Sequence, residues 1–246
     1  MTYCVGLMMD KGLVFMSDTR TNASLDNIAT FRKMFAFSRE GDRQIVVMTS
    51  GNLATTQAVI NLLEERSSAG LFSKESVFEA PTMFQVVSII GRTLRDVISD
   101  QSGESGQNAS TFHASFIVGG QINGGQMRLF LVYPEGNFIE ASTDTPFFQI
   151  GETKYGQPIL VRAFDRAMGF EEAIKLLMLS FDSTIKANLS VSSPFDVMIF
   201  ERDRIDGGRG FRIETDDPYF QSISSGWSDA LRDAFRSLDS FDLEGR

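Results

Sequence analysis

The residues best suited to chemistry lie in the first part of the chain, between Met1 and Lys33. If Met1 is removed, Thr2 becomes the first residue, and this removal is expected because aminopeptidases that cut initiator methionine accept threonine next to it. Thr2 then carries a hydroxyl and an α-amine on one residue. With a reference pKa of about 7.7 to 8.0, the amine can accept the hydroxyl proton at neutral pH. The sequence therefore predicts an N-terminal threonine nucleophile that requires no histidine, metal or other cofactor.

The elements that would position Thr2 follow from the apolar pattern of the first hundred residues. Four strands are expected before the first helix, over residues 3–9, 13–17, 31–38 and 44–49. The first two form a hairpin around the turn Asp10-Lys11-Gly12. Helices are expected over residues 53–66 and 81–99, with Pro81 in the first turn of the second.

The rest of the chain continues in blocks of one kind of element. A surface loop is expected over residues 101–110, followed by strands over 112–118, 127–133 and 137–141. Helices over 155–164 and 171–189, strands over 196–201 and 210–214, and a helix over 226–238 complete the pattern. Grouping of strands and helices in blocks favours an α+β fold with antiparallel sheets and helices stacked outside them.

Five sequence strings carry a family resemblance through most of the chain. They are Thr2-Tyr-Cys-Val-Gly6, Gly12-Leu-Val-Phe-Met-Ser-Asp18-Thr-Arg20-Thr-Asn22, Phe31-Arg-Lys33, Thr49-Ser-Gly51-Asn-Leu-Ala54 and Ile150-Gly-Glu-Thr-Lys-Tyr-Gly156. The chain resembles the N-terminal threonine peptidases of the proteasome β-subunit superfamily, and within it the bacterial Anbu (ancestral β-subunit) group. The resemblance implies a single N-terminal nucleophile hydrolase domain over residues 1–246, folded as an αββα four-layer sandwich.

The resemblance also implies roles for three residues besides Thr2. The ammonium of Lys33 would lie beside the threonine and keep its amine deprotonated, and Asp18 would hold Lys33. Both roles agree with electrostatics, because a nearby positive charge disfavours a protonated amine and a carboxylate stabilises an ammonium. The backbone N–H of Gly51 would stabilise the developing oxyanion, and a ligand can approach it closely because glycine lacks Cβ.

Four further residues would contact substrate if the resemblance holds. Thr21 and Asn22 would offer backbone groups that pair with an extended substrate strand. Thr49 and Leu53 would border the pocket for the residue before the cleaved bond.

The chain also departs from the pattern of active proteasome subunits. Gly151-Glu152 stands where those subunits carry Gly-Ser beside the nucleophile, and their downstream Asp-x-x-Ser-Gly is not recognisable over residues 188–193. A carboxylate at Glu152 would tend to raise the pKa of the threonine amine and weaken it as a base. Activity is therefore expected to be low, narrow or conditional.

Composition excludes several classes of function. The net charge of -9 argues against a nucleic-acid partner, because phosphate binding needs clustered lysines and arginines. One cysteine and one histidine provide neither an internal disulfide nor a zinc site of the usual ligand count. The N-terminal apolar stretch is broken by Asp10 and Lys11 before it reaches signal-peptide or membrane length. We expect a cytoplasmic protein without a membrane partner, and we expect His113 to lie in the core.

The sequence thus favours a threonine endopeptidase that hydrolyses peptide bonds within an assembly of its own copies. An exposed threonine and cleft would cut unfolded chains indiscriminately, so copies of the chain are expected to enclose it, as a ring or an open spiral. The family resemblance implies at least six copies. The helices over 81–99 and 226–238 are expected to pack mainly on their own sheets and to meet neighbours at their edges. Two alternatives remain open, an amidase that acts on a small amide and a catalytically silent scaffold of the same fold.

Overall fold

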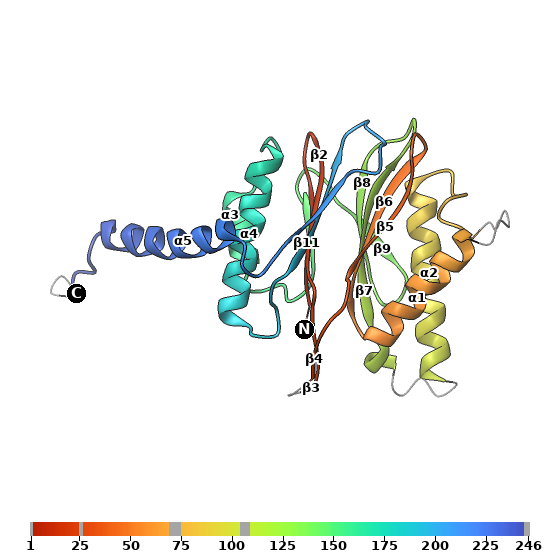
Figure 1. Cartoon of the computed structure of the whole chain (residues 1–246), viewed down its shortest axis with the longest axis horizontal. Coiled ribbons are helices and arrows are strands. Elements are labelled where there is room, and N and C mark those ends of the chain that lie inside the picture. The colour runs from red at the N-terminus through yellow and green to blue at the C-terminus, as the bar shows by residue number, and fades with distance from the viewer. Residues whose placement is uncertain (1, 25–26, 69–74, 104–108, 244–246) are drawn as a thin grey trace.

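Two antiparallel sheets packed face to face form the centre of the protein, and helices cover both outer faces (Figure 1). The computed structural model describes residues 2–24, 27–68, 75–103 and 109–243. The order of layers is α1 and α2, one sheet, the other sheet, then α3 and α4. This is the four-layer αββα arrangement that the sequence predicts.

The first sheet contains the N-terminal hairpin at its centre. Its strand order is β10 (Phe147–Gly151), β1 (Tyr3–Met8), β2 (Gly12–Asp18), β11 (Phe195–Glu201) and β12 (Arg209–Ile213). Every residue of β2 is buried, because its alternating side chains contact a different layer on each face. Phe15 packs between the sheets, and Met16 packs under the helices.

The second sheet follows the chain in simple order. Its strands are β5 (Met34–Arg39), β6 (Arg43–Gly51), β7 (Ala114–Ile122), β8 (Arg128–Val132) and β9 (Phe138–Glu140). The inner strand β6 alternates in the same way as β2. Val47 joins the core beneath α1 and α2, whereas Met48 joins the core between the two sheets.

Four helices cover the sandwich. They are α1 (Leu53–Ser68), α2 (Met83–Ser102), α3 (Gln157–Ala163) and α4 (Phe170–Ala187). The side chain of Thr82 caps α2 by accepting a hydrogen bond from the Gln85 N–H. A 3₁₀ turn, η1 (Ala109–Phe112), leads from this layer into β7. None of the helices in the described part of the chain is long and apolar enough to cross a membrane.

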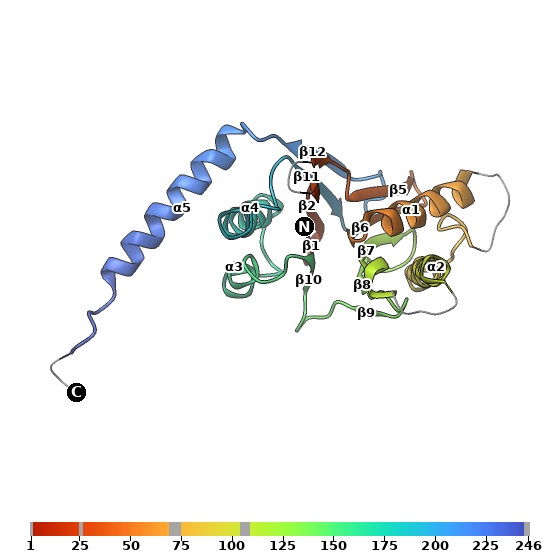
Figure 2. The same cartoon turned by 90° about the horizontal axis from the view of Figure 1, so that it is seen from below.

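The last helix, α5 (Pro218–Ser237), leaves the sandwich (Figure 2). Asp217 caps it by accepting a hydrogen bond from the Phe220 N–H, and Pro218 occupies its first turn. The sequence-based start at Gly226 was therefore wrong. The expectation that this helix packs mainly on its own sheet was also wrong, because only its first part contacts the protein body and Leu231 and Phe235 are 50% and 78% exposed.

The strand count also differs from the prediction. Six strands precede α1, because β3 (Arg20–Ser24) and β4 (Asn27–Thr30) form a separate two-stranded hairpin. Their polar residues show no apolar alternation, so the sequence pattern did not reveal them. Strand β10 was also missed. The loop expected over residues 101–110 is shorter than predicted, because α2 extends to Ser102 and η1 begins at Ala109. Residues 104–108 lie outside the described residues.

Candidate active site

Thr2 lies at the end of the sandwich where β1 begins and β10 ends. It is half-buried, and its carbonyl oxygen accepts a 2.7 Å hydrogen bond from the Glu152 N–H. Gly151, which precedes Glu152, has a φ of +84°, and a Cβ there would lie 2.0 Å from the Thr2 carbonyl oxygen. A glycine is therefore required for this close approach. Met1 lies outside the described residues, so its expected removal stays a prediction.

A buried ion pair lies directly beside the segment that carries Thr2. The Lys33 ammonium donates to both carboxylate oxygens of Asp18, at 2.8 and 2.9 Å, and to the carbonyl of Arg20 at 2.6 Å. Asp18 also accepts a 2.9 Å hydrogen bond from the Tyr3 N–H. Two steps of bonding thus connect the residue after Thr2 to Lys33, and the predicted pairing of Asp18 with Lys33 is present.

Burial dominates the electrostatics of this pair. It raises the pKa of Asp18 to about 6, and the positive charge and hydrogen bonds of Lys33 and the Tyr3 N–H limit that rise. The carboxyl is fully buried, as is the neighbouring Cys4. Burial also raises the pKa of the Cys4 thiol, which makes a 3.9 Å contact with the Thr49 carbonyl oxygen. Cys4 is thus a packing residue, as the sequence predicts.

Gly51 ends β6 and has a φ of +109°. A Cβ at this position would lie 2.4 Å from the carbonyl oxygen of His113, so only glycine fits without displacing the chain. Thr49 is buried, and its N–H donates a 2.9 Å hydrogen bond to the Lys33 carbonyl. Leu53 begins α1 and is partly exposed. The segment from Thr49 to Leu53 is thus joined to Lys33 by a backbone hydrogen bond.

The other two predicted substrate-binding residues lie on the separate hairpin. Thr21 and Asn22 belong to β3, where they pair with Ala29 and Ile28 of β4. The carbonyl of Arg20 at the start of the same strand accepts a hydrogen bond from Lys33. This contact joins the hairpin to the ion pair, so the expected substrate strand would run beside the catalytic candidates.

Glu152 is held by contacts that the sequence did not suggest. Its carboxylate is buried and accepts 3.0 Å hydrogen bonds from the Lys154 N–H and from the side-chain amide of Asn188. Asn188 follows α4 and lies 36 positions from Glu152 in the sequence. The sequence pointed to this region only through the unrecognisable Asp-x-x-Ser-Gly motif over residues 188–193. Glu152 thus bonds Thr2 through its backbone N–H and the residue after α4 through its carboxylate.

Two further observations concern His113 and metal binding. His113 is exposed where the chain enters β7, so its predicted place in the core was wrong. No group of three His, Cys, Asp or Glu side chains within the described ranges could hold a metal ion.

Comparisons with known proteins agree with this fold. A family model described as proteasome subunit matches residues 2–200. The proteasome subunit beta of Methanopyrus kandleri is 25% identical over 82% of this chain and 88% of its own length. Among solved structures, Anbu (ancestral beta-subunit) from Yersinia bercovieri is 41% identical, with a TM-score of 0.91 over 98% of this chain and 100% of that chain.

Two other solved structures are similar over nearly the whole chain. A Gly-1 mutant of Anbu from Hyphomicrobium sp. strain MC1 is 47% identical, with a TM-score of 0.90, over 99% of this chain and 100% of that one. A structure described as the helical assembly of the Anbu complex from Pseudomonas aeruginosa is 45% identical, with a TM-score of 0.91, over 98% of each chain.

Proposed function

We propose that this chain, which belongs to the proteasome subunit family and within it to the Anbu group, is a threonine endopeptidase with Thr2 as nucleophile. The observation that carries the proposal is the buried Lys33–Asp18 pair, which is bonded to the segment that bears Thr2. An ammonium at this place disfavours protonation of the Thr2 amine. The amine of the Met1-free chain can then accept the hydroxyl proton.

The proposed reaction passes through an acyl-enzyme. The Thr2 Oγ attacks the substrate carbonyl while its proton passes to the α-amine, and the Gly51 N–H stabilises the oxyanion. The amine then protonates the leaving nitrogen, and water hydrolyses the acyl-enzyme. Thr21 and Asn22 align the substrate by backbone pairing, and Thr49 and Leu53 border the adjoining pocket.

The test uses Met1-free protein, verified by intact mass, and a peptide library. Thr2→Ala should abolish hydrolysis and leave the circular dichroism spectrum unchanged, whereas Thr2→Ser should retain part of the activity because both reacting groups remain. Turnover by Thr2→Ala at the rate of the wild type would refute the nucleophile. Cleavage of small amides without cleavage of peptides would favour the amidase.

A second candidate function, a catalytically silent scaffold, is favoured by one observation. The buried Glu152 carboxylate beside Thr2 would raise the pKa of the amine and leave less of it free to act as a base. Native protein that retains Met1, or Met1-free protein that cleaves neither peptides nor small amides, would support this function.

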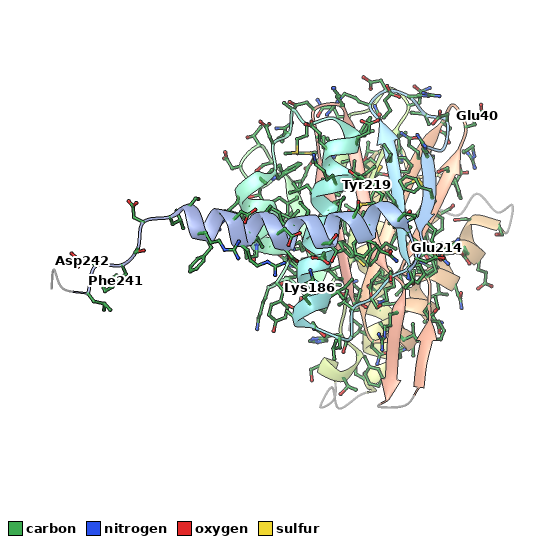
Figure 3. All side chains as sticks on the ribbon, turned by 60° about the vertical axis from the view of Figure 1, so that its left-hand side comes forward. Glu40, Lys186, Glu214, Tyr219, Phe241 and Asp242 are labelled. Atoms are coloured by element: carbon green, nitrogen blue, oxygen red, sulfur yellow. The ribbon has the colours of Figure 1, made fainter. Side chains whose placement is uncertain are left out.

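The exposed helix α5 supports the proposal that the protein assembles with its own copies. Its 20 residues span about 30 Å, and the bonds from Lys186 to the Ser224 carbonyl and the Ser228 hydroxyl fix only its first half (Figure 3). Leu231, Phe235 and Leu238 beyond this point are 50%, 78% and 71% exposed. An apolar face of this kind is typical of a protein interface.

We expect at least six copies, arranged as a ring or an open spiral, and located in the cytoplasm. Light scattering at micromolar concentration measures the assembly directly. Serine at both Leu231 and Phe235 should reduce the particle mass, while Asp233→Ser, on the opposite side of the same helix, should not. A wild-type particle of 27.3 kDa would refute assembly.

A further inference from the structure

A groove of about 450 Å³ lies along one open side of the sandwich, near the candidate active site but separate from the residues assigned above. The edge strands β5 and β12 of the two sheets lie on this side (Figure 2). Side chains from both sheets line the groove, namely Arg32, Met34, Asp196, Met198, Phe211 and Arg212. The groove is thus open at the gap between the two edge strands.

The sequence positions of these residues place the groove next to the ion pair. Arg32 and Met34 are the sequence neighbours of Lys33. Asp196 of β11 pairs with Ser17 of β2, which is the sequence neighbour of Asp18. Arg212 pairs with Asp196 one strand further out. Three strand spacings, roughly 14 Å, therefore separate Arg212 from β1, the strand that follows Thr2. An extended chain crosses that distance in about four residues.

The charges of the groove differ from those of the whole protein. Two arginines and one aspartate line it, although the chain has a net charge of -9. Asp196 Oδ1 accepts a 2.7 Å hydrogen bond from Nε of Arg212, so this pair is close to neutral. Its Oδ2 is buried and has no hydrogen-bond partner among the described residues. Arg32 is exposed and adds a positive charge at the mouth.

The remaining surface suits an extended polypeptide. β12 has no further strand beside it within the described residues, so its outer edge offers backbone N–H and C=O groups. Met34 and Met198 supply an apolar floor, and Gly210 leaves room there because a Cβ at this position would lie 2.9 Å from Cε of Met198. The backbone of a bound strand would pair with the edge of β12. An anionic side chain of that strand would match Arg32, and an apolar side chain would match the methionine floor.

We propose that this groove binds the substrate chain about four residues from the cleaved bond and selects a glutamate or aspartate there. The inference rests on the proposed peptidase function and adds a specificity determinant to it. Arg32 binds the acidic side chain, and the free edge of β12 pairs with the substrate backbone.

The test measures binding without turnover. Met1-free Thr2→Ala protein is titrated into fluorescein-labelled heptapeptides that differ only by glutamate or glutamine at the central position, and anisotropy gives Kd. The glutamate peptide should bind about fivefold more tightly at low salt, the size expected of one partly exposed ion pair. The preference should disappear at about 0.5 M NaCl.

Two variants make the result specific. Arg32→Gln should abolish the preference and leave the glutamine peptide unaffected, while Arg209→Gln, on β12 but outside the groove lining, should retain it. Equal Kd values for the two peptides, no binding of either, or an unchanged preference in Arg32→Gln would overturn the inference. In Thr2 protein, Arg32→Gln should raise KM for acidic peptides with kcat unchanged. Absence of any hydrolysis would contradict the proposed function alone, because the anisotropy result does not depend on catalysis.

Discussion

Replacement of Gly151 by alanine should displace the nucleophile without changing any reacting group. The new Cβ would lie 2.0 Å from the Thr2 carbonyl oxygen and 3.2 Å from the Thr2 Cβ, and real Cβ contacts under 3.0 Å essentially never occur. Thr2 must therefore move by about 1 Å, a misplacement that can cost about 100-fold in rate. That factor corresponds to about 2.7 kcal/mol in activation free energy.

The same substitution should also lower stability. A residue other than glycine at a φ of +84° costs about 1 to 2 kcal/mol. Loss of the hydrogen bond from the Glu152 N–H to Thr2 adds about 0.5 to 1.5 kcal/mol. The free energy of unfolding should therefore fall by roughly 1.5 to 3.5 kcal/mol.

Gly124→Ala provides a matched control. Gly124 has a similar φ of +74°, and a Cβ there would have nothing within 4 Å. It should lose about 1 to 2 kcal/mol of stability and keep its activity. Unfolding by urea at fixed protein concentration and the rate of peptide hydrolysis measure both effects. Equal rates in the two variants would refute the reasoning that Gly151 positions Thr2.

Three further predictions concern the ion pair and Glu152. Lys33→Ala should remove hydrolysis near neutral pH. Lys33→Arg should restore little activity, because a planar guanidinium cannot replace a compact ammonium. Unchanged pH–rate profiles in both variants would show that Lys33 has only a structural role. Hydrolysis should fall as the pH drops through about 6, where Asp18 becomes protonated. Because this folded-state pKa lies above the ordinary value, Asp18 favours the folded state at low pH, and that contribution is lost as the pH rises through about 6. The acid loss of activity should therefore occur without unfolding, and a coincident loss of circular dichroism would contradict this. Glu152→Gln should lower the pKa of the Thr2 amine and move the ascending limb of the pH–rate profile to lower pH, whereas an unmoved limb would show that the carboxylate does not act on the amine.

The sequence predicted the elements of the sandwich and the ion pair for different reasons. Buried strands such as β2 and β6 contain short apolar runs, and α2 and α4 have clear apolar stripes, so local pattern predicted most of the elements. Their αββα arrangement came from the family resemblance. The pairing of Lys33 with Asp18 came from the family resemblance, and the structure adds its bidentate geometry. Their roles in catalysis, like those of Thr2 and Gly51, stay predictions.

The features that the sequence did not predict depend on contacts between remote residues. The bond between Asn188 and Glu152 joins residues 36 positions apart, and no local pattern indicates it. The groove at β5 and β12 exists only because the edges of two sheets lie on one side. The start of α5 was a different case, since Asp217 followed by Pro218 is a local start signal that the apolar pattern concealed.

The burial of Cys4 makes the protein a convenient host for spectroscopic labels. It is the only cysteine of the chain, it is fully buried, and its raised pKa leaves little thiolate to react with maleimides. A new cysteine can therefore be introduced on α5 and labelled alone, while the native residue stays in place. Distances between two such spin labels would report how the last helices of neighbouring copies are arranged in solution, including any difference between a closed ring and an open spiral.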